Sequence, residues 1–488
     1  MTVRFPLSLR IKTSVLALCA MTLVALPQIA LAATLADSVS EALESHPAIA
    51  AKKATVDAAN ANVREQRSAF FPQVAVGARF GRESEDDDTT RVFSNGFETS
   101  WLGEGTASVT QPLFTGFQNV NRLEAAKDRQ KAAHFDLSGS ADDVALRAAR
   151  AHLNLMRTHD LLDIARKYME AIQGRKDSIK LMVDEGAGDQ SDLLQADEIL
   201  MAAKTTRLGY EEAFRQAEAD YIAAVGVSPG NVLEFGPRTW DRLVPKTVEQ
   251  AIMTGVNANP GVKSASAIVE ALGKDAQADK GSLIPRLDAE FSGTDQDKRE
   301  ELGGELKNVQ GMLKMSWNFS TGGGQYAHID RDLSARREAS AKLDDARRTV
   351  EHDVRQKYTS MTIVDEQFDL MRDREKADEQ ILANLTSQFE GGRQSNLQLI
   401  NSNARLFEAR ASRTDAYYRR LLARFELLSA MGGLRDAFVP SGPGLVMTSA
   451  PLALPVREAD MAPVAPHAKS AAPREPETGI VSVPPTGR

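Results

Sequence analysis

The chain has 488 residues, of which 42% are hydrophobic, 26% charged and only 6% aromatic, and its formal net charge is −8. The apolar content is too high for a wholly disordered chain, and no glycine period suggests a collagen-like rod. The single cysteine, Cys19, excludes a disulfide scaffold and a multi-cysteine zinc site. The negative charge argues against nucleic acid as a partner. A prior of about 150 residues per domain would give roughly three globular domains.

Residues 1–32 have the three parts of a secretory signal peptide. Basic residues come first, an apolar run follows over 15–26, and Ala30-Leu31-Ala32 supplies the small-x-small pattern that a signal peptidase accepts. About twelve apolar residues are too few to span a bilayer core of about 30 Å, which disfavours an N-terminal membrane anchor. Leu18 precedes Cys19 where a lipoprotein signal would have a small residue, so we expect no lipid there. The sequence therefore predicts an exported protein without a later transmembrane helix.

Prolines are concentrated towards the ends of the chain. Ten of the 20 lie in residues 440–488, a stretch rich in Pro, Ala and Ser without apolar periodicity, and we expect a disordered tail there. Residues 113–228 and 286–439 contain none. Because an interior proline costs a helix about 3 kcal/mol, these regions are predicted to form long helices. Their apolar residues recur every three or four positions, which is typical of coiled-coil-like packing of helix on helix.

Landmarks in the first half of the chain recur in the same order in the second half. His46-Pro47 is followed 25 residues later by Phe71-Pro72, and Asn259-Pro260 is followed 25 residues later by Ile284-Pro285. Three further matches are Phe114-Thr115-Gly116 with Ser320-Thr321-Gly322, Glu185-Gly186 with Glu390-Gly391, and Ala224-Val225-Gly226 with Ala430-Met431-Gly432. The interval between each landmark and its second copy is too long for one unit of a solenoid. The protomer is therefore predicted to be internally duplicated, with structural repeats over 33–240 and 241–439.

Each repeat is predicted to hold a helix, two strands, a very long helix, a glycine-rich turn and a last helix. The predicted helices are 37–70, 118–183 and 191–226 in the first repeat, and 247–283, 324–389 and 395–431 in the second. The two shorter helices together equal the longer one, which at about 1.5 Å per residue is about 100 Å long. We therefore expect the short pair to stack end to end beside the long helix.

The predicted strands alternate apolar and polar residues with period two. They span 72–82, 105–114, 285–294 and 309–319. A soluble antiparallel sheet with one wet face is the commoner cause of such a pattern. Here the loops within each pair are long and highly charged, which favours the staves of a membrane β-barrel with apolar residues outward. Because four strands cannot close a barrel, the protomer is expected to form a trimer with twelve strands.

Together these features resemble the TolC family of outer-membrane channel proteins over essentially all of residues 33–435. The matching segments are Leu35-Ala36-Asp37, His46-Pro47-Ala48-Ile49, Gln111-Pro112-Leu113-Phe114-Thr115-Gly116, Glu185-Gly186 and Asp192-Leu193-Leu194-Gln195-Ala196, with their duplicates. The resemblance implies a mainly α-helical protomer with a membrane β-barrel. It implies a homotrimer whose barrel joins a helical tunnel, placed in the outer membrane of a Gram-negative bacterium and extending into the periplasm.

The resemblance also implies a function without reaction chemistry. The channel would be the outer-membrane exit duct of a type I protein secretion system or, alternatively, the outer-membrane factor of a drug efflux pump. Its partners would be a periplasmic adaptor protein, an inner-membrane transporter, outer-membrane lipid and the exported protein or drug. The His-Pro and Asn-Pro helix starts and the absence of a lipid cysteine favour the secretion branch. An exported coiled-coil adhesin or periplasmic scaffold is the alternative from another class; it does not explain the alternating strands.

The resemblance places the functional site at the tunnel tip, near the turns 184–192 and 390–401. Family members have an aspartate ring in the second repeat, but the aligned residues here are the neutral Gln398 and Asn401. In the first repeat Asp189 and Asp192 would supply acidic character at a ring that selects cations, or else act as helix N-caps. The adaptor-contact candidates, which also fit tight turns and helix caps, are Gly186, Gly188, Gly391 and Gly392.

The sequence contains no constellation typical of an enzyme. His152 and His159 lie seven residues apart, which is too far for a shared metal without further ligands. The nucleophile-elbow, P-loop and zinc-protease motifs are missing. We therefore expect no catalytic residues, no metal site and no cofactor.

Overall fold

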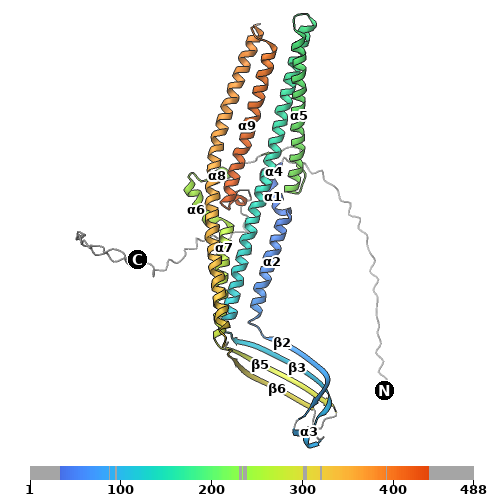
Figure 1. Ribbon diagram of the computed structural model, residues 1–488, viewed down its shortest axis with the longest axis vertical. Helices are drawn as coiled ribbons and strands as arrows, with labels where there is room; N and C mark the ends of the chain where they lie inside the picture. Colours follow the sequence, from blue (N-terminus) through green and yellow to red (C-terminus); the bar gives the residue numbers. More distant parts are fainter. Residues whose placement is uncertain are drawn as a thin grey trace, which may run out of the picture. The chain divides into compact units, whose positions relative to one another are not determined.

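A computed structural model describes most of the chain between residues 33 and 438 (Figure 1). The described residues are 33–86, 88–93, 96–229, 233–234, 239–299, 305–318, 321–391 and 393–438. The predicted signal peptide, the predicted tail and Gly392 lie outside these ranges. None of the described helices combines the length and the apolar character that crossing a membrane requires.

Helices dominate the described residues, and the same succession of elements occurs twice. In the first half the helices of more than ten residues are α1 (Leu35–Ser45), α2 (Pro47–Ser68), α4 (Gln118–Asp184) and α5 (Gln190–Val225). In the second half they are α6 (Val248–Ala258), α7 (Pro260–Lys280), α8 (Gly324–Glu390) and α9 (Asn396–Ala430). The two long helices have 67 residues each. The predicted long helices are confirmed to within one residue at each end.

The first helix of each half is broken, which corrects the predicted single helices 37–70 and 247–283. His46 and Asn259 both have non-helical backbone, with ψ values of 128° and 125°. Each residue precedes a proline, whose ring disfavours helical geometry in the residue before it. The proline then takes the first position of the next helix, where its missing N–H is no loss. The side chains of His46 and Asn259 cap these new helices by accepting hydrogen bonds from backbone N–H groups.

The four predicted strands form one antiparallel sheet in the order β2-β3-β5-β6. Their bounds are Gln73–Glu85 for β2, Glu98–Phe114 for β3, Arg286–Arg299 for β5 and Glu305–Ser316 for β6. The strands run further into the charged loops than predicted. Pairing explains this extension, because Glu85 lies opposite Glu98 and Arg82 opposite Trp101 at the far end of the ladder. A short helix, α3 (Asp88–Phe93), follows β2.

The shorter helices stack end to end in two columns, as expected. Below α5, the Ser45 hydroxyl donates to the Val225 carbonyl over 3.1 Å, which joins the end of α5 to the end of α1, where α2 begins. Below α9, the Asn259 amide donates to the Ala430 carbonyl, also over 3.1 Å, which joins α9 to α7. Both columns pack against α4, and α7 and α9 also pack against α8 (Figure 1).

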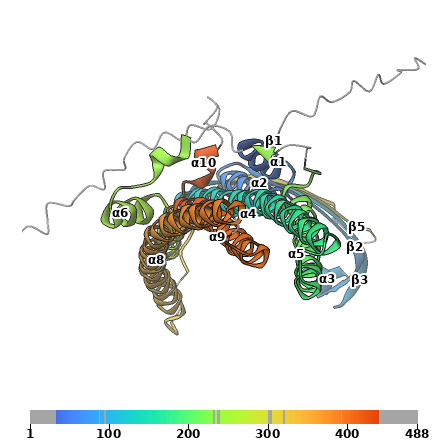
Figure 2. The same ribbon diagram turned by 90° about the horizontal axis from the view of Figure 1, so that it is seen from above.

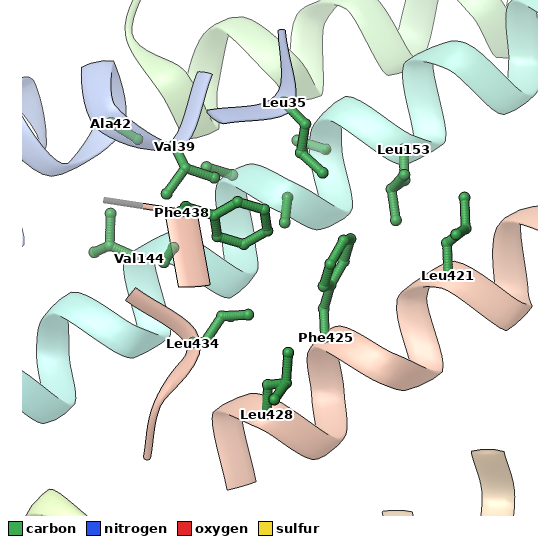
Figure 3. Close-up of a cluster of buried hydrophobic side chains, with 14 of the residues drawn as sticks. Leu35, Val39, Ala42, Val144, Leu153, Leu421, Phe425, Leu428, Leu434 and Phe438 are labelled. Carbon is green, nitrogen blue, oxygen red and sulfur yellow. The ribbon is translucent and has the colours of Figure 1, made fainter. Parts of the chain in front are cut away.

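The main hydrophobic core lies where α1, α4, α9 and α10 (Leu434–Phe438) meet (Figure 3). Phe425 of α9 is fully buried there, and its ring meets that of Phe438 edge-on at 5.2 Å. Sequence reasoning missed α10, the short parallel pair β1 (Ala33–Thr34) and β4 (Leu233–Glu234), and the 3₁₀ helices Thr239–Leu243 and Gly281–Leu283. These elements are too short to show a periodic pattern.

Candidate functional site

The first helical hairpin turns between α4 and α5, at the predicted tip 184–192. Gly186 has a φ of +76°, a backbone conformation that side chains disfavour. A β-carbon on Gly188 would lie 2.9 Å from the backbone nitrogen of Val183, so the chain folds tightly against the end of α4. The geometry of the turn therefore explains why glycine occurs at both positions. Contact of these two residues with an adaptor remains a prediction.

Asp189 is the N-cap of α5. Its carboxylate accepts a hydrogen bond from the backbone N–H of Ser191 over 2.9 Å. This bond, together with one from the Ser191 hydroxyl, holds the pKa of Asp189 below its usual range. Asp192 lies in the first turn of α5 and is half-buried, where a negative charge interacts favourably with the helix dipole. Both carboxylates thus stabilise the start of α5, and a role for either in a constriction remains a prediction.

The second hairpin turns between α8 and α9. Ser395 caps α9 by accepting a hydrogen bond from the backbone N–H of Gln398. Gly391 ends α8 with a φ of −81°, which any residue can adopt. Gln398 and Asn401 lie one turn apart on α9 and are both exposed, whereas Leu399 between them is buried. The structure therefore brings the two neutral residues to one exposed face near the tip.

The two hairpins touch within one protomer. The amide nitrogen of Asn396, at the start of α9, lies 3.3 Å from the sulfur of Met182 near the end of α4. Further from the tips, the rings of Tyr168 and Phe407 stack with centroids 4.6 Å apart. Sequence reasoning missed this contact because Asn396 and Met182 are 214 positions apart. The tip is thus a joint structure of both halves of the chain.

The charge at the tip is unevenly divided between the hairpins. Residues 184–192 include four acidic residues and no basic one, whereas residues 390–401 include only Glu390 and Arg393. A ring of symmetry-related copies would therefore carry its negative charge on the α4–α5 hairpin. Among the residues that the structure describes, no group of three or more acidic or histidine side chains is placed to hold a metal ion.

The sheet has one apolar and one polar face. Register places Val76, Ala107, Gly293 and Val309 in one row across the four strands, and Val74, Val109, Phe291 and Gly311 in the next row. The opposite face carries charged pairs, such as Arg79 with Glu104 at 2.5 Å. The apolar rows have no cover within the described chain: Val309 is 90% exposed and Val76 81%. A sheet with this exposed apolar face requires an apolar partner in place of water.

Comparison with known proteins matches this architecture. The model of the family described as "Outer membrane efflux protein" covers residues 38–227 and 256–433, one range in each half of the chain. The outer membrane efflux protein BepC of Brucella suis is 22% identical over 414 residues, covering 83% of this chain and 86% of BepC. The outer membrane protein TolC of Vibrio cholerae is also 22% identical, covering 83% of this chain and 92% of that protein.

Solved structures share the fold at low sequence identity. A crystal structure of CusC aligns with a TM-score of 0.69 at 14% identity and covers 83% of this chain and 93% of that one. The outer membrane protein VceC of Vibrio cholerae aligns with a TM-score of 0.66 at 15% identity, covering 82% and 96%. The chain therefore belongs to the outer membrane efflux protein family and is a TolC-type channel protein of the Gram-negative outer membrane that extends into the periplasm.

Proposed function

We propose that the chain forms the passive exit duct of a transporter-driven export system, as a ring of three protomers. The observation that carries this proposal is a pair of exposed apolar stripes on two different helices. On α5 the stripe consists of Leu194, Met201 and Leu208, and on α8 it consists of Ile363, Leu370 and Ile381. All six side chains are between 44% and 66% exposed.

The two stripes are suited to each other. Their members are spaced by seven or eleven residues, close to whole numbers of helical turns, so each stripe follows one face. The two stripes also lie at similar distances from the hairpin tips. Met201 lies 11 residues from the start of α5, and Ile381 lies 9 residues from the end of α8. Because the two stripes lie on different helices, a contact between α5 of one copy and α8 of the next copy is heterologous. Heterologous contacts that close form a ring.

The sheet supports the same assembly. Within the described chain, β2 and β6 each pair on one side only, which leaves two open edges in every protomer. Open edges favour pairing with another strand. Joining β6 of one copy to β2 of the next would close twelve strands into a barrel with the apolar rows towards lipid, a size within the range of membrane barrels.

The expected partners follow from this duct. A periplasmic adaptor would meet the hairpin tips, and an inner-membrane transporter would supply energy. The helix starts at Pro47 and Pro260 and the absence of a lipid cysteine favour type I protein secretion. Two of the relatives are instead named for efflux: BepC is an outer membrane efflux protein, and CusC belongs to a cation efflux system. We therefore propose two classes of cargo for the duct: small molecules, exported by efflux, and proteins, exported by secretion.

Cysteine crosslinking tests the ring. The only native cysteine lies in the predicted signal peptide, so introduced cysteines would react cleanly. Met201→Cys combined with Ile381→Cys should crosslink the protein into dimers and trimers, whereas either single variant should remain monomeric in denaturing gels. Crosslinked dimers from a single variant would indicate a two-fold interface and would contradict the ring.

Gene deletion separates the two cargo classes. Loss of an efflux duct should raise the susceptibility of the cells to toxic small molecules, whereas loss of a secretion duct should remove a protein from the culture medium. The wild-type gene should restore whichever phenotype is found. A deletion strain that shows neither of these phenotypes would contradict an export role.

A further inference from the structure

A groove opens along α4 between α5 and α9. Figure 2 shows α5 and α9 on one side of α4, with α1 and α10 on the other. The groove has a volume of about 650 Å³, which is within the usual range for sites that bind small molecules. Its apolar lining includes Ala223 and Leu422. Four arginines line it: Arg147, Arg150, Arg157 and Arg419.

Two of these arginines are neutralised within the protein. Arg157 forms an ion pair with Asp415 at 2.7 Å and also donates to Asn154. Arg150 forms an ion pair with Glu426 at 2.8 Å. Both partners lie on or beside the groove wall of α9. These two arginines therefore tie α4 to α9 and are not the groups that a ligand would bind first.

In the part of the chain that the structure describes, the other two arginines have no carboxylate partner. Arg419 is exposed and makes no hydrogen bond or ion pair with any residue that the structure describes. Arg147 only approaches Nε2 of His46, at 3.4 Å. His46 already accepts from the Ala48 N–H through Nδ1, so in its neutral form the single proton lies on Nε2, which then cannot accept from Arg147. Asp220 on α5 is the one other acidic group in the groove lining besides Asp415.

The ion pairs between α4 and α9 show at which heights along the groove Arg147 and Arg419 lie. Arg150 lies level with Glu426 and Arg157 with Asp415, so Arg419 lies level with α4 near residue 154. The backbone of Arg147 is therefore about two helical turns, or about 10 Å along the helix axis at about 1.5 Å per residue, from the level of Arg419. The groove combines an apolar floor with one cationic group towards each end.

We propose that this groove binds an amphipathic organic anion, whose carboxylate, sulfonate or phosphate groups pair with Arg147 and Arg419 while its hydrocarbon part covers Ala223 and Leu422. Arginine suits this role because its planar guanidinium donates two parallel hydrogen bonds to such groups. This inference rests on the proposed function: in a ring whose passage is lined by the face of α4 away from α1 and α10, the groove gives the duct a binding step for anionic cargo.

The test is binding of naphthalene-1,5-disulfonate, a rigid aromatic dianion, to the purified trimer in uncharged detergent, measured by equilibrium dialysis. Wild-type protein should bind it saturably, and added salt should weaken the binding. The variant Arg147→Gln/Arg419→Gln should lose about tenfold or more in affinity. The matched control is Arg166→Gln/Arg405→Gln, which removes two exposed arginines from the same helices outside the groove, and it should bind as the wild type does.

Two outcomes would overturn the proposal: no saturable binding to the wild type, or equal weakening in both double variants, which would indicate attraction by general charge. Conductance of the same preparations in planar bilayers separates this result from the proposed function. Conductance without binding would remove the anion groove and leave the duct. Binding without conductance would remove the duct and leave the groove as a ligand site.

Discussion

Gly432 at the end of α9 should be intolerant of any side chain. Its φ is +77°, a conformation that costs a residue with a β-carbon about 1–2 kcal/mol. A β-carbon there would also lie 2.5 Å from Cδ of Pro260 and 2.7 Å from Cα of Asn259. Overpacking of this kind typically adds about 1–3 kcal/mol. Gly432→Ala should therefore destabilise the junction between α9 and α7 by about 2–5 kcal/mol.

The neighbouring glycine provides a matched control. A β-carbon on Gly433 would meet no atom within 4 Å, and its φ lies outside the left-handed region. Gly433→Ala should change stability by no more than about 0.5 kcal/mol. We would compare the thermal unfolding midpoints of both variants in detergent at one scan rate, together with their cleavage by trypsin near the junction. Equal midpoints for the two variants would refute the reasoning about the junction.

Three further predictions concern the core, the pH dependence of stability and the tip. Phe425→Ala should lower the free energy of unfolding by about 3–5 kcal/mol because it empties the centre of the main core. The control Phe97→Ala, at an exposed site before β3, should leave the thermal unfolding midpoint unchanged. A similar loss of stability in both variants would contradict the packing described for Phe425. Burial raises the pKa of Asp142 to about 6, from an ordinary value of 3.8. The stability held by its protonated form is therefore complete below about pH 4 and is lost as the pH rises through about 6. Asp142→Asn keeps an oxygen that can accept from the Arg435 N–H, so its thermal midpoint should vary less between pH 4 and pH 7; an unchanged slope would mean that Asp142 does not titrate in this range. Asp192→Ala should weaken cation preference if this residue lines the constriction, and an unchanged reversal potential would exclude it.

The long helices could be predicted from sequence because their signal is local and sustained. Proline is absent over more than a hundred residues, and apolar residues recur every three or four positions, so α4 and α8 were located almost to the residue. The breaks at His46 and Asn259 also have a local signal, the following proline. We predicted continuous helices there because the flanking alanine-rich segments favour helix on both sides, whereas the residue before each proline is held in an extended conformation.

The parts of the site that depend on pairing of distant segments could not be predicted. Arg157 and Asp415 are 258 positions apart, and only the packing of α9 on α4 brings them together. The same holds for the contact between Asn396 and Met182 at the tip. By contrast, the capping role of Asp189 follows from its type and its place before α5, and the sequence already offered that interpretation.

The most direct test of the exit duct is ion conductance of the purified full chain in planar lipid bilayers. The unheated protein should migrate as a trimer in mild detergent and as a monomer after heating, and the trimer should produce discrete steps of current. A monomeric, water-soluble protein that produces no current would contradict the account.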